Sequence, residues 1–96
     1  MLPPSAFEWD EAKRRSNLAK HGLDFVAAIR IFEGSVWIRQ DRRRDYGEDR
    51  YQAVGTVQGR VVFITFTWRG EVCRIIQARI ASREERSLYQ AFLAKG

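Results

Sequence analysis

The stretch VVFITFTWRGEVCRIIQARIAS, residues 61–82, decides the fold of this chain. It consists largely of β-branched and aromatic residues, which favour strands. Arg69-Gly70 interrupts it with glycine in the second position of a two-residue turn, a signal for a β-hairpin. Gln58-Gly59 repeats that signal upstream. The sequence therefore predicts three antiparallel strands in succession from Arg50 onward.

Two helices are predicted before these strands. Asp10 is a typical N-cap residue, and Gly22 ends the segment that follows it. Asp24 begins a second helix, whose apolar residues have helical spacing up to Gly34. We expect residues 1–6, MLPPSA, to be a disordered lead-in, because two prolines and small residues hold little regular structure.

The remaining segments complete one domain over residues 7–96. SVWIRQ, residues 35–40, predicts a short strand, and the charged run at residues 41–49, DRRRDYGED, predicts a loop. Ser82 and Glu85 form the capping box of a C-terminal helix. The order is therefore ααββββα. We expect an α+β fold whose helices pack on one face of an antiparallel sheet.

The two faces of the predicted sheet differ in polarity. Pairing Trp68 with Glu71 across the turn places Arg74 opposite Thr65, and side chains alternate between the faces from there. One face is almost wholly apolar. The other gathers polar residues toward one end: Arg50, Gln52, Thr65, Thr67 and Arg74. With no acid predicted on that face, we expect unneutralised guanidinium groups that favour an anion.

Two alternatives to this interpretation stay open. Threonine and arginine are ordinary residues on the wet side of an antiparallel sheet, where they need no ligand. A β-bulge near Ala78 or in the segment WRGEV would also exchange the two faces beyond it.

Composition and charge limit the class of protein. The chain has 96 residues, is 45% hydrophobic and carries a net charge of +5, mostly from arginine. This excess favours a polyanionic partner, either nucleic acid or an acidic protein. One cysteine and one histidine exclude a disulfide framework and a zinc-ligand set, so we expect no metal and no cofactor. The sequence has neither a membrane-spanning apolar run nor a signal-peptide pattern, so we expect a cytoplasmic protein without a membrane partner.

Three segments resemble the BrnT toxins of bacterial BrnT/BrnA toxin–antitoxin pairs. They are FEWDEAKRRSNLAKHGLDF at 7–25, EDRYQAVG at 48–55 and RIIQARIASREERSLY at 74–89. The chain departs from the family at Gln77, usually serine, and at Ile80, usually a basic residue. The resemblance implies a RelE-like fold, metal-independent RNA cleavage and neutralisation by a BrnA-like antitoxin. It also implies that promoter DNA is bound only by the toxin–antitoxin complex.

Metal-free RNA cleavage uses the 2′-hydroxyl as nucleophile, and the enzyme must stabilise charge at phosphorus and move two protons. We expect arginines for the first task and the lysine or histidine of the K-H-G segment for the second. A histidine at the end of a helix is more often a capping residue. Glu48, a loop acid, is a further candidate base, and Tyr89 of the C-terminal helix a further candidate proton donor. The candidate catalytic residues are Arg74, Arg50, Lys20, His21, Thr65 and Arg79.

Further residues are expected to contact RNA without taking part in bond cleavage. Their amides, hydroxyls and guanidinium groups suit phosphate and ribose oxygens. They are Gln52, Thr67, Arg42, Arg43, Arg44 and Arg69. The same surface also suits a non-catalytic nucleic-acid-binding module, or an interaction domain that docks an acidic protein.

Overall fold

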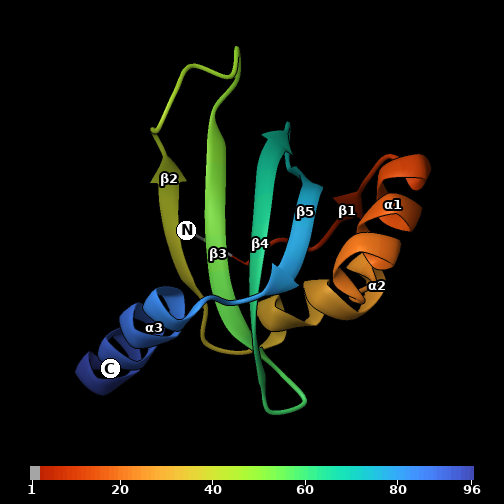
Figure 1. The fold of residues 1–96 in the computed structure, drawn as a ribbon. Helices are drawn as coiled ribbons and strands as arrows, with labels where there is room; N and C mark the ends of the chain where they lie inside the picture. The colour runs from red at the N-terminus through yellow and green to blue at the C-terminus, as the bar shows by residue number, and fades with distance from the viewer. Residues whose placement is uncertain (1–2) are drawn as a thin grey trace.

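The structure is a computed structural model that describes residues 3–96 (Figure 1). Part of the expected disordered lead-in, residues 1 and 2, lies outside the described residues. Residues 3–6 contain neither helix nor strand, and the carbonyl of Ala6 accepts a hydrogen bond of 2.9 Å from the backbone N–H of Cys73. The lead-in is therefore attached to the domain at its last residue.

A single five-stranded sheet in the order β1-β5-β4-β3-β2 organises the chain. Its strands are β1 (Phe7–Glu8), β2 (Trp37–Asp41), β3 (Arg50–Val57), β4 (Arg60–Arg69) and β5 (Val72–Ile80). The predicted succession of three antiparallel strands is confirmed as β3, β4 and β5. The expected order ααββββα and the purely antiparallel sheet are wrong, because β1 precedes the helices and runs parallel to β5.

The helices are α1 (Glu11–His21), α2 (Phe25–Ala28), the 3₁₀ helix η1 (Ile29–Glu33) and α3 (Arg83–Lys95). The limits of α1 follow the prediction: the Asp10 carboxylate accepts the backbone N–H of Lys13, and Gly22 adopts a left-handed φ of 69°. The second predicted helix divides into α2 and η1. Its buried residues are Phe25 and Ala28 in α2 and Ile31 and Phe32 in η1.

The larger hydrophobic core lies between α2, η1 and one face of the sheet. Its largest fully buried side chains on that sheet face are Phe66, Ile64, Ile75, Val62 and Cys73. Gly55 lets η1 approach β3 closely, because a β-carbon at this position would lie 2.7 Å from the β-carbon of Ile31. The predicted apolar face is therefore confirmed as a core face.

A smaller core lies on the opposite face of the sheet, beneath α3 (Figure 1). It contains Val54 and Phe63 from the sheet with Ala81 and Tyr89 from the C-terminal segment. The Tyr89 hydroxyl donates a hydrogen bond of 2.8 Å to the carbonyl of Ser35. The expectation that all helices pack on one face is therefore wrong, because the apolar end of the second face forms a site for α3.

The second hairpin differs from its predicted register. Arg69 pairs with Val72, so the turn residues are Gly70 and Glu71, with Gly70 at a φ of 61°. The first hairpin, by contrast, turns at Gln58-Gly59 as predicted, since Val57 pairs with Arg60. Before the bulge described below, the shift moves the β4 partner of each β5 residue by two positions. Each side chain therefore stays on its predicted face. Arg74 lies opposite Thr67 instead of Thr65.

A β-bulge in β5 changes the faces further along the strand. Phe66 pairs with Ile75 but Thr65 pairs with Gln77, so Ile76 is an extra residue. Beyond the bulge, Arg79 turns to the face of Thr65, opposite Phe63, while Ala78 and Ile80 join the larger core. The predicted register would have put Arg79 opposite Arg60, and the observed register without the bulge would have put it opposite Val62 on the core face.

Candidate active site

Strand register arranges polar side chains in two rows on the sheet face that carries α3, beyond the small core. The row nearer the loop at residues 42–49 consists of Asp41, Arg50, Thr67, Arg74 and Glu8. The next row consists of Arg39, Gln52, Thr65 and Gln77. These nine residues are called the polar face below. The structure thus brings together all five polar residues that the sequence placed on one face.

Acids that the sequence analysis did not expect lie on the polar face and beside it. Arg74 Nη1 lies 3.0 Å from Glu8 Oε2, because β1 adds Glu8 directly beside Arg74. Arg50 Nε lies 3.4 Å from Glu48 Oε2, and Arg69 Nη2 lies 3.6 Å from Glu48 Oε1. The expectation of unneutralised guanidinium groups is therefore wrong for Arg50 and Arg74.

The ion pair between Arg74 and Glu8 is partly open to solvent. The Arg74 side chain is 27% exposed and that of Glu8 41%. Such exposed pairs contribute little stability, about 0–1 kcal/mol. A phosphate, which offers an arginine two anionic oxygens at once, can therefore displace the carboxylate without a large loss of free energy.

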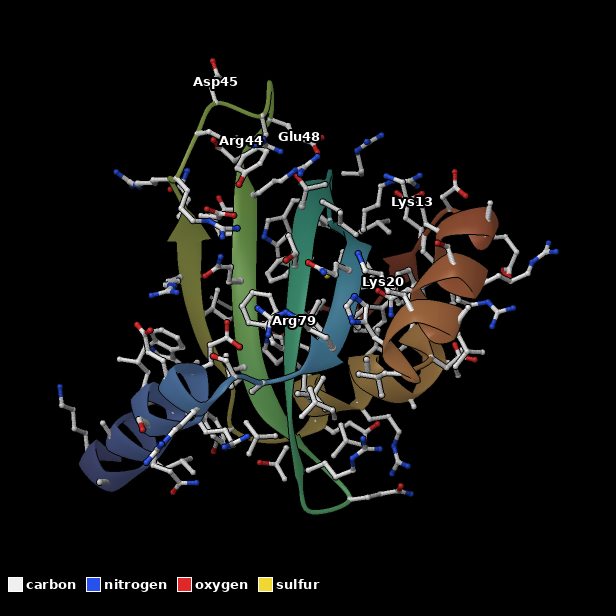
Figure 2. All side chains as sticks on the ribbon, viewed as in Figure 1. Lys13, Lys20, Arg44, Asp45, Glu48 and Arg79 are labelled. Carbon is white, nitrogen blue, oxygen red and sulfur yellow. The ribbon has the colours of Figure 1, made fainter. Side chains whose placement is uncertain are left out.

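Arg79 has a firmer partner than the other candidates. Its Nη1 and Nη2 donate to the two carboxylate oxygens of Glu85 at 2.7 and 2.8 Å, and its guanidinium lies 4.0 Å from the centre of the Phe63 ring. Figure 2 shows its side chain over the sheet, on the side viewed. These contacts link β5 to the first turn of α3 and favour a structural role for Arg79.

The polar residues beside the arginines are held in fixed orientations. Gln52, Thr65 and Thr67 are buried. Thr67 Oγ1 donates a hydrogen bond of 2.6 Å to the carbonyl of Asp49. Gln52 Oε1 accepts one of 2.7 Å from Arg39 Nε. The middle of the polar face is therefore rigid, as a site that orients a substrate requires.

Lys20 and His21 lie in the last turn of α1. Lys20 is three positions after Asn17, whose side chain bonds the backbone of β5, so both residues share one side of the helix. Lys20 accordingly lies on the side of α1 that faces the sheet (Figure 2). His21 is the last residue of α1 and is half-buried. Of the two, Lys20 has the clearer position for reaching a substrate at the β5 edge.

The three consecutive arginines lie in the loop between β2 and β3, which spans residues 42–49 because Asp41 belongs to β2. Arg42 Nη2 donates to Gln40 Oε1 at 3.1 Å, and Arg43 pairs with the Asp41 carboxylate. The guanidinium of Arg44 lies 4.9 Å from the centre of the Tyr46 ring. All three side chains are exposed, in keeping with the predicted contacts to RNA.

Sequence reasoning missed Arg39 and Glu8. Arg39 is exposed, forms no ion pair within residues 3–96 and lies 5.0 Å from the centre of the Trp37 ring. An open cavity of about 330 Å³ beside it is lined by Arg39, Gln40, Asp41, Arg42, Arg43 and Gln52. The alternation in SVWIRQ could have indicated Arg39, had the pairing of β2 been known. A two-residue strand such as β1 has no periodicity to indicate Glu8.

Other site chemistries find little support in the residues present. Cys73 is buried in the larger core, and burial raises the pKa of its thiol to about 12, so it is not a reactive thiolate. Residues 3–96 contain no group of three or more His, Cys, Asp or Glu side chains placed to hold a metal ion. Within the same range, no helix has the length and apolar character to cross a lipid bilayer.

These features define a class: a small α+β domain whose mixed sheet carries a cluster of partly exposed arginines over buried threonine and glutamine side chains on one face. Comparison with protein families is more specific. The chain belongs to the family described as ribonuclease toxin, BrnT, of type II toxin-antitoxin system, whose model matches residues 9–85. It is accordingly a ribonuclease toxin, with RNA as its target and an antitoxin as its protein partner. No curated protein matches the chain.

Proposed function

We propose that this toxin is a metal-independent endoribonuclease with a RelE-like fold that cleaves RNA through attack of the 2′-hydroxyl. The observation that carries the proposal is one row of the polar face. In that row, Arg50 of β3 and Arg74 of β5 lie on either side of Thr67 of β4. Both arginines have carboxylate partners that a phosphodiester can replace.

Arg74 and Arg50 stabilise the negative charge that develops on the phosphorus oxygens. Neither guanidinium loses its proton, and each offers several N–H donors. A single preorganised donor of this kind contributes about 3 kcal/mol to lowering a barrier. We assign Thr65, Thr67 and Gln52, which are buried, to the floor of the site beneath the phosphate and ribose, and Arg69 with the arginines at 42–44 to contacts with the RNA backbone.

The reaction needs two proton transfers. The 2′-oxygen forms a bond to phosphorus as its proton leaves, and the bond from phosphorus to the 5′-oxygen breaks as that oxygen gains a proton. We assign Glu8 as the acceptor of the first proton, a proposal supported by its contact with Arg74. Lys20, on the side of α1 facing the sheet, or His21 beside it donates the second. The products are a 2′,3′-cyclic phosphate and a free 5′-hydroxyl.

The partner proposed for this toxin is a BrnA-like antitoxin that covers the polar face and the arginines at 42–44. Acidic groups of the antitoxin would replace Glu8 and Glu48 there, as the phosphate does. We also propose that the pair works in the cytoplasm, and that promoter DNA is bound by the complex and not by the toxin alone.

The test is cleavage of end-labelled RNA by the purified chain in excess EDTA. We expect cyclic-phosphate ends, and we expect Arg74→Ala to lower kcat about 100-fold because a preorganised donor is lost. Arg60→Ala, an exposed arginine at the β3–β4 hairpin, is the matched control and should cleave like the parent. Cleavage that requires an added metal would contradict the mechanism.

One observation favours a second function. Arg50 and Arg74 both have carboxylate partners in the free chain, which also fits a face that holds ligands weakly without reacting. Intact RNA in the same assay, together with salt-sensitive binding, would identify a non-catalytic nucleic-acid-binding module.

A further inference from the structure

Asp41, the last residue of β2, has the most buried carboxylate among the ion pairs of residues 3–96, with its side chain 1% exposed. Its Oδ1 accepts hydrogen bonds from Arg43 N at 3.2 Å and Arg43 Nε at 2.9 Å. Its Oδ2 accepts bonds from Arg43 Nη2 at 2.8 Å and the Tyr46 hydroxyl at 3.0 Å. One buried carboxylate thus fixes the course of the loop from residue 42 to residue 46.

The ring of Tyr46 contacts two arginines. The guanidinium of Arg50 lies 4.4 Å from the ring centre and that of Arg44 lies 4.9 Å from it. Arg50 comes from the polar face, whereas Arg44 belongs to the loop. Tyr46 therefore joins a rigid anchor, Asp41, to an arginine that we place in the active site.

The contacts of Arg50 explain why its side chain needs this support. Strand pairing puts Arg50 next to Asp41, yet the two form no ion pair, because Arg43 and Tyr46 occupy the Asp41 oxygens. The ion pair of Arg50 with Glu48 is long, at 3.4 Å. The ring of Tyr46, held by its hydroxyl on Asp41, lies against the same guanidinium, 4.4 Å from the ring centre. A cation on an aromatic ring is held through its face, which leaves the N–H groups at its edge free to bind a phosphate.

We propose that Asp41 and Tyr46 are positioning residues for the ribonuclease reaction: Asp41 fixes Tyr46, and the ring of Tyr46 holds the Arg50 guanidinium ready for the scissile phosphate. The inference rests on the proposed function and on the role of Arg50 in it. Neither positioning residue touches the reacting atoms. Fixing a donor before the substrate arrives raises kcat, because the enzyme need not reorganise during the reaction.

A double-mutant cycle tests this relation through kcat at saturating RNA. We expect Tyr46→Leu to lower kcat about tenfold with little change in KM, and Arg50→Ala to lower it further. Tyr46→Leu added to Arg50→Ala should have no additional effect, because Tyr46 acts only through Arg50. If the second substitution still lowers kcat tenfold in the Arg50→Ala background, Tyr46 has a general structural role and the inference is overturned.

Conservative variants separate the ring from its anchor. Tyr46→Phe keeps the ring but loses the bond to Asp41, so its kcat should lie between those of the parent and Tyr46→Leu. Asp41→Asn, which keeps the size of the side chain, should behave like Tyr46→Phe. Tyr89→Phe is the matched control: it removes another tyrosine hydroxyl bond, to Ser35, and should leave kcat unchanged.

A spectroscopic measurement separates failure of the inference from failure of the proposed function. The δ-methylene protons of Arg50 should show an upfield ring-current shift in the NMR spectrum of the parent. The shift should persist in Tyr46→Phe and vanish in Tyr46→Leu. RNA left intact by the parent would overturn the proposed function, and with it a role for Tyr46 in catalysis. An unchanged Arg50 shift in Tyr46→Leu would overturn the inference even if RNA is cleaved.

Discussion

Arg74 lies in the middle of an apolar strand and remains charged, because a guanidinium does not lose its proton in proteins. Two features of its surroundings explain how a charged side chain fits at this position. The strand alternation points it away from the larger core, and Glu8 of β1 provides a carboxylate at 3.0 Å. In the proposed mechanism the same carboxylate accepts the proton of the 2′-hydroxyl while Arg74 holds the phosphate.

The Glu8→Gln variant tests the chemical part of this role. We expect it to lower kcat about 100-fold, since removal of a general base typically costs 10²-fold or more. The free energy of unfolding should change by less than about 1 kcal/mol, because the ion pair is exposed. Single-turnover cleavage and urea unfolding provide the two measurements. Glu33→Gln, an exposed acid paired with Arg30 at 3.6 Å, is the control and should cleave at the parental rate. Equal rates for both variants would remove Glu8 from the mechanism.

At the scale of a single element, the bulge in β5 determines which side chains reach the polar face. Without Ile76 as an extra residue, Gln77 and Arg79 would point into the larger core. Asn17 of α1 stabilises the backbone just beyond the bulge. Its Nδ2 donates to the carbonyl of Ala78 at 2.7 Å, and its Oδ1 accepts the Ala78 N–H at 3.2 Å. The side chain of Asn17 thus hydrogen-bonds the edge of β5 beyond the two residues that pair with β1.

Removing the Asn17 amide should therefore destabilise the protein strongly. We expect Asn17→Ala to lower the free energy of unfolding by about 2–4 kcal/mol, because it leaves the Ala78 N–H and carbonyl without partners in a buried place. Urea unfolding followed by circular dichroism measures the loss. Ser16→Ala, the adjacent exposed position of α1, should change the same quantity by less than 0.5 kcal/mol. A loss of the same small size in Asn17→Ala would show that the bulge needs no such support.

For the whole molecule, the ion pair of Arg79 with Glu85 joins α3 to the sheet. Glu85 also completes the capping box with Ser82, so a single carboxylate, 13% exposed, begins the helix and attaches it. Burial alone would raise the pKa of Glu85, but hydrogen bonds from Arg79 and from the backbone of Ser82 outweigh it and lower the pKa. Asp41 behaves alike: the hydrogen bonds from Arg43 hold the pKa of its carboxyl well below the usual range, against the effect of burial.

These two carboxylates predict acid sensitivity. A carboxylate whose pKa is lower in the folded state contributes stability above its unfolded pKa, about 4 for Asp and Glu, and loses it as the pH falls through the folded value. We therefore expect the free energy of unfolding to decrease below about pH 4. Glu85→Gln should flatten part of this dependence, whereas Glu84→Gln, an exposed acid in the same turn, should leave it unchanged. Urea unfolding at a series of pH values measures this dependence. Identical profiles for the parent, Glu85→Gln and Glu84→Gln would contradict the role given to Glu85.

The sequence by itself determined the parts of this protein that depend on neighbouring residues. Helix limits at Asp10, Gly22 and Ser82, the succession of strands from Arg50, and a polar and an apolar face all follow from caps, turns and alternation, which act over a few residues. The five predicted polar residues share a face because none of them lies beyond the bulge in β5. Arg74 precedes it, and the other four belong to β3 and β4.

Only the tertiary structure decided which groups meet across the fold. Glu8 and Arg74 are 66 residues apart, and Asn17 and Ala78 are 61 apart. Neither contact leaves a periodic pattern in the chain. The charge balance of the polar face, the place of Arg79 and the side on which α3 packs depend on such contacts. These contacts stabilise the fold only once the sheet has packed against its helices, so no pattern among neighbouring residues predicts them.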